Sequence, residues 1–464
     1  MWCWQWPSGK AAAPGAPARW PPVRAKGMTE PSRQTKNHAN ADSPANGGVS
    51  ADTGTDRSGG EPGIANAPSF GSFVRYFLGL GTWGFGGPIA TVGYMQRDLV
   101  ERRNWMTRAD FLDGVALGQT MPGPLAAQVA MWVGYLRRGT FGALAVAAAF
   151  IMPSFLLVLT VAAVYRRYSG LPVVQSLFYG IAPVVVAIIA VAAWKLAKLT
   201  NKADKRLWAI SVALMLVTAI TGAEIAYLFI AAGLLMLLWD APPRGLLPRR
   251  ARPSSRPGDP PSAARALAAP AVLVAMEHSW IVLAAAGGTL VALGLFFAKA
   301  GAFIFGSGLA IVPFLREGVV VQHHWLTSGQ FLDAIAMGLI TPGPVVITAT
   351  FIGYLVGGLA GAVVATVAIF TPIYLGVVIP GRWFVRHRSN KQVKAFVRGA
   401  TAAAAGAIAG AVTVLARQAI PDWKTVLLAV AALALSLKWK VKEPYLVGLG
   451  AAAGILLHWS SHPF

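Results

Sequence analysis

Two Pro-Gly-Pro sequences interrupt apolar stretches of this 464-residue chain. Proline removes a backbone donor and clashes with the preceding turn, and glycine permits unusual dihedral angles, so a helix must break at each. A helix that restarts after such a break directs its N–H groups and positive dipole end at the space before it. A kink used only for packing would explain one break, but two at equivalent positions favour an anion site. The six residues are Pro122, Gly123, Pro124, Pro342, Gly343 and Pro344.

A second pair of breaks is rich in glycine. Close packing of helices through small residues would explain them, and so would a ligand that approaches bare backbone, so both interpretations stay open. The first break is Gly84-Phe85-Gly86-Gly87-Pro88, and its counterpart is Phe305-Gly306-Ser307-Gly308. From this pair we include in the predicted substrate site Phe85, Gly86, Gly87, Pro88, Phe305 and Gly306.

Polar and charged side chains near the breaks are further candidates. Intramembrane charge is costly and marks function by default, although a long side chain can instead reach the headgroups. Arg75 and Lys299 each precede a glycine-rich break. Amides and hydroxyls can bind an oxyanion, but threonine can equally bond its own helix. The candidates beside the Pro-Gly-Pro breaks are Gln119, Thr120, Gln128, Thr341, Thr348 and Thr350, and we predict that Gln128, Thr341, Thr348 and Lys299 bind substrate.

Helix starts are indicated at Thr107 and Thr327, because each is followed three residues later by a polar acceptor, Asp110 or Gln330. This spacing resembles a capping box. Asp113 and Asp333 then lie one turn into the helix, where a carboxylate suits the helix dipole. A proton-carrying role is the alternative.

The breaks belong to an internal repeat. Residues 85–124 and 305–344 align at a fixed offset of 220, with 15 of 40 positions identical. Repeated halves with interrupted helices at corresponding positions are typical of transporters whose site lies near the bilayer midplane.

Composition requires a membrane. Mean hydropathy is +0.56 and only 12% of residues are charged, and several apolar runs reach the ~20 residues that span a bilayer. The net charge of +22 does not indicate nucleic acid, because the basic residues occupy short loops, where they set orientation. Cys3 is the single cysteine, and neither metal-ligand spacings nor a nucleotide-binding glycine loop occur. We therefore predict no metal, no cofactor and no ATP hydrolysis.

We predict an all-α polytopic protein with about 13 transmembrane segments. Its parts are a disordered tail (1–68), a first repeat (69–239), a basic Pro-rich linker (240–268) and a second repeat (269–464) with an extra leading helix near 279–297, followed by a segment at 299–315. The extra helix would invert the second repeat, leaving the N-terminus cytoplasmic and the C-terminus periplasmic. The hairpin at Arg137-Arg138 is basic and its counterpart at 356–360 is uncharged, as inversion requires. The loop 97–108 does not fit this topology, because it would lie outside although it carries four arginines.

These motifs together resemble the chromate transporter (CHR) family, in its long two-domain form. The resemblance covers about residues 70–459. In the first half it rests on Phe85-Gly86-Gly87-Pro88, Val100-Glu101-Arg102-Arg103, Trp105, Phe111-Leu112, Ala116-Leu117, Pro122-Gly123-Pro124, Gln128 and Pro153-Ser154. In the second it rests on Phe305-Gly306, Pro313-Phe314-Leu315-Arg316, Trp325, Phe331-Leu332-Asp333, Thr341-Pro342-Gly343-Pro344, Thr348-Ala349-Thr350 and Gly353-Tyr354.

The resemblance implies an inner-membrane transporter that exports chromate, lowers its cytoplasmic level and so confers chromate resistance. It also implies coupling to an ion gradient, for which we name the proton, and oppositely oriented halves. Two departures from the family pattern affect the second half: Ser307 stands where glycine is expected, and the basic run after Arg316 is reduced to Glu317-Gly318 and His323-His324.

The sequence also allows three other functions to be considered: transport of another oxyanion, an enzyme and a membrane scaffold. Sulfate has the shape and charge of chromate, so a sulfate or other tetrahedral oxyanion transporter is the alternative. An enzyme would need a nucleophile and base or metal ligands in the apolar segments, where we find none, and a scaffold would not need paired breaks. The expected partners are the oxyanion, a proton and membrane lipid, without nucleic acid; a homodimer is left open.

Overall fold

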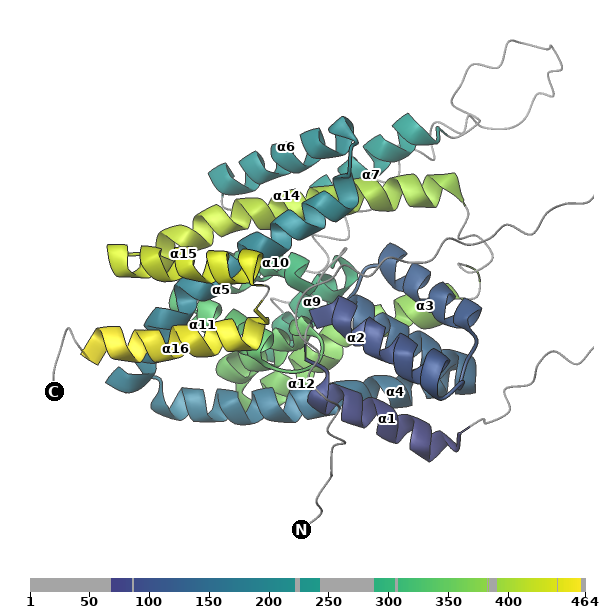
Figure 1. Ribbon diagram of the computed structural model, residues 1–464, viewed down its shortest axis with the longest axis horizontal. Helices are drawn as coiled ribbons and strands as arrows, with labels where there is room; N and C mark the ends of the chain where they lie inside the picture. Colours follow the sequence, from purple (N-terminus) through teal and green to yellow (C-terminus); the bar gives the residue numbers. More distant parts are fainter. Residues whose placement is uncertain are drawn as a thin grey trace, which may run out of the picture. The chain divides into compact units, whose positions relative to one another are not determined.

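The computed structural model describes residues 68–85, 87–221, 226–242, 288–304, 308–381, 383, 390–439 and 441–459. Throughout these ranges every regular element is helical. Nearly all of the expected tail (1–68) and linker (240–268) lies outside them. The helices of the two repeats are shown in Figure 1.

The two repeats place the same elements in the same order. The first begins with α1 (Phe70–Trp83), α2 (Gly87–Met95), the π-helix η1 (Gln96–Arg102), α3 (Arg108–Thr120) and α4 (Leu125–Tyr168). The second begins, in its described part, with α9 (Gly288–Ala302), η2 (Gly308–Ala310), α10 (Ile311–Arg316), the π-helix η3 (Glu317–Gln322), α11 (Ser328–Ile340), η4 (Val345–Ile347) and α12 (Thr348–Val378).

Local backbone geometry repeats as well. Asn104 and His324, at the 220-residue offset, both adopt positive φ angles, 49° and 50°. A non-glycine residue enters this region only where its surroundings demand it, and each of these residues directly follows the C-cap of its π-helix. The matched geometry shows that the sequence repeat is also a structural one.

The predicted helix starts at Thr107 and Thr327 are confirmed. The Thr107 hydroxyl accepts a hydrogen bond from the Asp110 N–H at 3.1 Å. Thr327 and Gln330 form the complete capping box, with bonds of 3.2 and 3.0 Å. Each cap satisfies N–H groups that an uncapped helix end would leave without a partner.

The elements α4 and α12 each contain a reversal of the chain. Gly139 and Gly358 have φ angles of 59° and 60°, which glycine adopts without steric cost. Gly134 lies against Gly142 across the first reversal, whereas residues eight apart in a straight helix are ~12 Å apart. The equivalent pair in the second repeat is Gly353 and Gly361. Both predicted hairpins, near residues 137–138 and 356–360, are thus present.

One predicted boundary is wrong. We expected one segment to end near residue 297 and another to begin at 299, but α9 continues through both positions. It is the counterpart of α1, because Gly81 on α1 packs against the Phe150 backbone and Gly301 on α9 against the Ile369 backbone. An apolar run with Lys299 in it resembled two segments, whereas one charged side chain near a helix end does not stop the helix. Residues 279–287 lie outside the described ranges.

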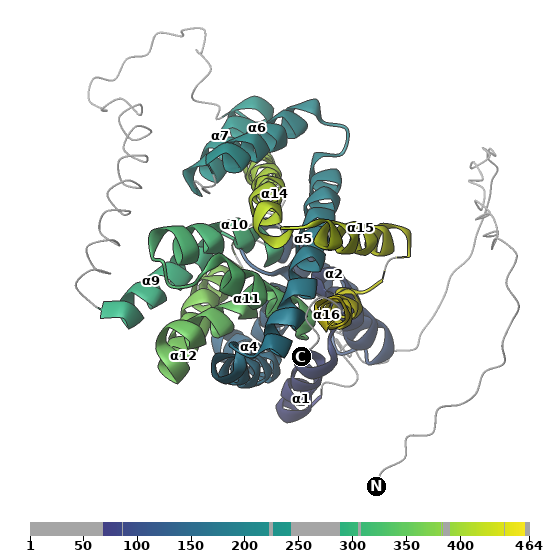
Figure 2. The same ribbon diagram turned by 90° about the vertical axis from the view of Figure 1, so that its left-hand side faces the viewer.

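In the described part of the chain each repeat continues with three further helices. They are α5 (Pro172–Asn201), α6 (Lys205–Thr221), α7 (Ala226–Asp240), α14 (Lys391–Ala419), α15 (Trp423–Lys438) and α16 (Glu443–Trp459). Figures 1 and 2 both show α6 and α7 beside α14, and α15 and α16 alongside α5. Among the described residues, four helical elements are long and apolar enough to cross a membrane: Leu125–Tyr168, Pro172–Asn201, Val345–Val378 and Lys391–Ala419.

Candidate functional site

Both Pro-Gly-Pro sequences break their helices as predicted. The first separates α3, ending at Thr120, from α4, and the second separates α11, ending at Ile340, from η4 and α12. Gly123 and Gly343 have φ angles of 140° and 96°, values that favour glycine. Pro124 and Pro344 occupy the N-cap positions of the helices that follow, and neither helix has a side-chain cap.

The first Pro-Gly-Pro loop contacts the glycine-rich break of the other repeat. The Gly123 N–H donates a hydrogen bond of 2.6 Å to the carbonyl oxygen of Ile304. Ile304 is the last described residue before the second glycine-rich break. A backbone donor freed by the helix break is therefore satisfied by the other repeat, as a low-dielectric interior demands.

The second Pro-Gly-Pro loop also contacts the other repeat. The Ser154 hydroxyl, on α4, donates a hydrogen bond of 2.6 Å to the carbonyl oxygen of Pro342. Gly343 lies so close to the Ser154 side chain that a Cβ would collide with it. Ile373 holds the equivalent position on α12, and a Cβ on Gly123 would lie 3.0 Å from its Cγ2. Each loop therefore packs against the equivalent helix of the opposite repeat, the first loop against α12 and the second against α4.

A cavity of about 60 Å³ lies where motifs of the two repeats meet. The first glycine-rich break contributes Gly84, Phe85, Gly87 and Pro88 to its wall. The second Pro-Gly-Pro region contributes Thr341 and Gly343. We call this space the central cavity. Six residues that sequence reasoning assigned from separate motifs, with Gly84 among them, thus share one small space.

The central cavity also has a carboxylate in its wall, which sequence reasoning missed. Glu443, at the start of α16, lines the cavity and is half-buried. Its position in a short loop before an apolar run predicts an interfacial residue. Only the packing of α16 against α5 and α11 brings it to the breaks, and a single sequence carries no signal for that packing.

Two of the predicted ligands brace the loops rather than line the cavity. Gln128 is fully buried, and its side-chain amide donates to the carbonyl oxygens of Pro122 (2.8 Å) and Met121 (3.4 Å). Thr348 is fully buried and donates to the Val345 carbonyl at 2.8 Å. By contrast, the buried Thr341 lines the cavity and contacts the Gly338 carbonyl at 3.3 Å.

Other predicted residues lie elsewhere or outside the described ranges. Lys299 is half-buried in the last turn of α9 and is not part of the central cavity wall. Gly86, Phe305 and Gly306 fall outside the described residues. Asp333 accepts a hydrogen bond of 2.7 Å from the Tyr165 hydroxyl of the first repeat, so it links the two halves. Among the described residues no group of three or more His, Cys, Asp or Glu side chains could hold a metal.

Paired helix breaks that meet at one cavity between two repeats are characteristic of secondary membrane transporters. A sequence model of the Chromate transporter family matches residues 71–237 and 291–455, once for each repeat. This chain belongs to the chromate transporter family.

Curated relatives cover almost the whole matched region. The chromate transport protein of Cupriavidus metallidurans is 48% identical over 398 residues, 85% of this chain and 95% of the relative. The probable chromate transport protein of Synechococcus elongatus is 45% identical over 396 residues, 85% of this chain and 97% of the relative. No solved structure matches the chain.

The bond between the repeats predicts a stability effect. Ser154→Ala leaves the buried Pro342 carbonyl without its donor, which costs about 1–3 kcal/mol, so we expect a lower melting temperature for the purified protein in detergent. Thr160→Ala is the matched control, because this exposed hydroxyl on the same helix bonds only its own helix, at Leu156. Equal melting temperatures for the two variants would contradict a structural role for the inter-repeat bond.

Proposed function

We propose that this chain exports chromate across the bacterial inner membrane and so confers chromate resistance, with the oxyanion bound in the central cavity. The observation that carries the proposal is the reciprocal meeting of each Pro-Gly-Pro loop with the opposite repeat, which supports a shared site at the repeat interface. The family membership and the names of the relatives support chromate as substrate. These names include no enzyme, and we propose that the chain is a transporter alone.

The chemistry of the cavity suits a tetrahedral oxyanion. Backbone N–H groups at the glycine-rich break and at the nearby uncapped helix start after Pro344 offer donors without a fixed full charge. The Thr341 hydroxyl becomes a further donor when it turns from the Gly338 carbonyl to the anion. Such donors bind an anion through backbone N–H groups and the helix dipole. Gln128 and Thr348 stabilise the loops through hydrogen bonds to the Pro122 and Val345 carbonyls, without lining the cavity. Sulfate, which shares shape and charge with chromate, is the alternative substrate.

The electrical driving force favours export. Moving one charge across the membrane is worth ~2.3 kcal/mol per 100 mV, so an inside-negative potential drives an anion outward. We propose that Glu443 carries a proton with the substrate. An ionised carboxylate in the cavity wall repels a dianion, whereas the protonated acid admits it. A dianion moving with one proton keeps one net negative charge, so the potential still favours its exit.

Chromate-51 accumulation tests the function directly. Cells that express this chain should accumulate less label than cells without it, and Gly343→Ala should remove the difference, because residue 343 needs a positive φ and has no space for Cβ beside Ser154. Gly376→Ala is the control, since a Cβ there meets nothing within 4 Å. Thr341→Val, which keeps the side-chain shape, should also impair export if the cavity binds the anion.

Membrane levels of each variant must match the unmodified chain. Unchanged accumulation in cells that express the unmodified chain would refute export. Raised accumulation that excess sulfate blocks would identify a sulfate importer instead.

The role of Glu443 predicts a change in proton coupling. In proteoliposomes the unmodified chain should move protons together with chromate, while Glu443→Gln should move chromate without protons, because an amide cannot carry a proton. Glu317→Gln, on η3 and away from the central cavity, is the control. Equal proton movement with chromate in all three proteins would exclude Glu443 as the proton carrier.

We further propose that the two repeats are inverted within about 13 transmembrane segments, with the N-terminus cytoplasmic and the C-terminus periplasmic. Arg138→Cys and Leu359→Cys, introduced singly after Cys3→Ser, place a thiol at each exposed hairpin. A membrane-impermeant maleimide should label position 359 in intact cells and position 138 only after permeabilisation. Labelling of both positions from the same side would mean that the repeats are parallel.

A further inference from the structure

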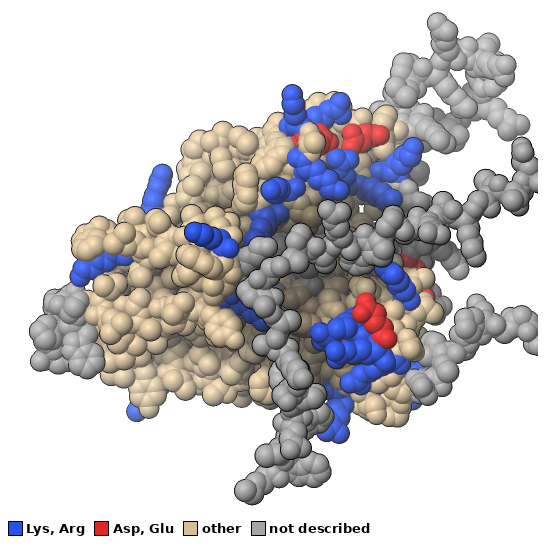
Figure 3. Space-filling view, in the orientation of Figure 1, with Lys and Arg blue, Asp and Glu red and all other residues tan. Residues whose placement is uncertain are grey.

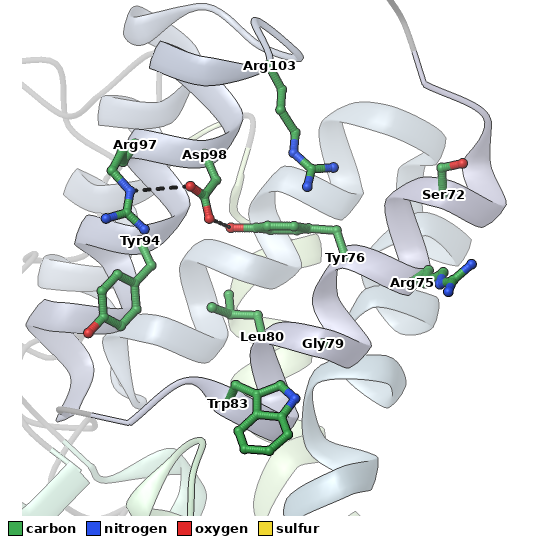
Figure 4. A pocket seen from close by; sticks show the side chains of 10 residues that line it. All are labelled: Ser72, Arg75, Tyr76, Gly79, Leu80, Trp83, Tyr94, Arg97, Asp98 and Arg103. Carbon is green, nitrogen blue, oxygen red and sulfur yellow. Dashed lines mark hydrogen bonds and ion pairs between the residues drawn. The ribbon is translucent and has the colours of Figure 1, made fainter. Parts of the chain in front are cut away.

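A second and larger cavity, of about 620 Å³, lies among α1, α2 and η1. Its wall includes the exposed side chains of Arg75, Arg97 and Arg103. Figure 4 shows Asp98 between Arg97 and Tyr76, with Arg103 beside the Tyr76 ring and Arg75 on the far side of the Tyr76 backbone, its side chain directed away from the ring. We call this space the arginine cavity. In Figure 3 basic side chains gather over the region that Figure 1 labels α2.

The arginine cavity carries excess positive charge. Asp98 is its one carboxylate, and it already contacts Arg97 (3.3 Å), Arg102 (3.7 Å) and the Tyr76 hydroxyl (3.5 Å). The Arg103 guanidinium lies 5.3 Å from the centre of the Tyr76 ring and 4.7 Å from that of the Trp105 ring. Within the described part of the chain Arg75 and Arg103 form no ion pair. Two guanidinium groups therefore remain for an anion.

The second repeat shows that the fold does not need these charges. Phe296 stands at the position of Tyr76, Gly318 at that of Asp98 and His323 at that of Arg103. The Phe296 ring packs directly on Gly318, where a Cβ would collide with it. It also stacks on Phe314, with ring centres 5.4 Å apart, and meets Trp325 edge-on at 5.8 Å. In the second repeat the equivalent space is thus filled by aromatic rings, whereas the first repeat holds arginines around an open space.

The arginine cavity adjoins the central cavity along the chain. Leu80 and Trp83, at the end of α1, line the arginine cavity, and the next residues, Gly84 and Phe85, line the central one. Figure 4 shows Trp83 at the end of the arginine cavity away from Arg103. The Trp83 side chain is 79% exposed, so packing does not hold it in place. The end of α1 thus lies between the two spaces, with a large movable side chain at the boundary.

We propose that the arginine cavity is an oxyanion capture site, where a tetrahedral dianion binds before it passes Trp83 into the central cavity. This inference rests on the proposed function, because it assigns a second site to the same substrate. Guanidinium groups bind tetrahedral oxyanions through paired N–H donors. Excess charge at a cavity mouth also raises the local anion concentration, an effect that salt screens. The arginines of loop 97–108, which the positive-inside rule does not explain, thereby acquire a role.

The phosphate of an anionic phospholipid headgroup offers the same tetrahedral oxyanion chemistry, so the experiment must separate the two sources. The test variant is Arg75→Gln combined with Arg103→Gln, and the control is Arg108→Gln, an exposed arginine of the same loop that does not line the cavity. Each purified protein is reconstituted in liposomes of phosphatidylcholine alone and in liposomes that also contain phosphatidylglycerol. Chromate transport is measured against chromate concentration at low and high salt. Equilibrium binding of labelled chromate is measured in neutral detergent.

In phosphatidylcholine the double variant should show a KM raised by at least about tenfold, because each of its two lost charge-assisted contacts is worth about tenfold or more. Its maximal rate should be retained, because the central cavity is intact. Raising the salt concentration should raise the KM of the unmodified chain and of Arg108→Gln, and should change that of the double variant much less. Chromate binding in detergent should weaken in parallel.

An unchanged KM and unchanged chromate binding in the double variant would overturn the capture site. A defect confined to liposomes with phosphatidylglycerol would identify the ligand as lipid and also overturn it. If the unmodified chain does not transport chromate, the proposed function fails, and the detergent measurement still decides the capture site. Binding weakened by the double variant would then support the site, and equal binding would refute it.

Discussion

The fold depends on one constraint: backbone groups freed inside a membrane must find partners within the protein. Two helix breaks per repeat release such groups, and neither repeat satisfies them alone. The Gly123 N–H bonds to Ile304 of the second repeat, and the Pro342 carbonyl accepts from Ser154 of the first. The breaks therefore hold the repeats together. These contacts between the repeats also place backbone groups of the breaks in the wall of the central cavity, where a substrate can contact them.

Reciprocity between the repeats does not make them identical. Ser154 and Ile373 occupy equivalent positions, yet one holds its loop by a hydrogen bond and the other by apolar contact. Gln128 braces the first loop with a long amide, and Thr348 fills the corresponding place with a short hydroxyl. The chain thus tolerates different chemistry at each equivalent position as long as the loop stays fixed.

The sequence predicts this architecture well because its strongest signals are local. Proline and glycine dictate where helices break, and threonine with a polar residue three positions later dictates where α3 and α11 begin. The predicted boundary between residues 297 and 299 failed because hydropathy alone cannot tell a helix with one lysine from two short segments. Glu443 was missed for a different reason: its place in the central cavity depends on how α16 packs against α5, a contact between distant residues that no local pattern encodes.

Tyr76 and Phe296, at equivalent positions, mark the clearest difference between the two repeats. These side chains differ by one hydroxyl group, and the Tyr76 hydroxyl donates a hydrogen bond to Asp98. The second repeat has Gly318 at the position of Asp98, and the Phe296 ring packs directly against it. The Asp98 carboxylate pairs with Arg97 and Arg102, and Arg75 and Arg103 leave net positive charge at the rim of the arginine cavity. Aromatic packing is the simpler way to stabilise this junction, and the second repeat uses it. The first repeat keeps the edge-on contact of Tyr76 with Trp105, at 6.0 Å, but has a charged cavity where the second repeat stacks Phe296 on Phe314. Stability alone gives no reason for this difference.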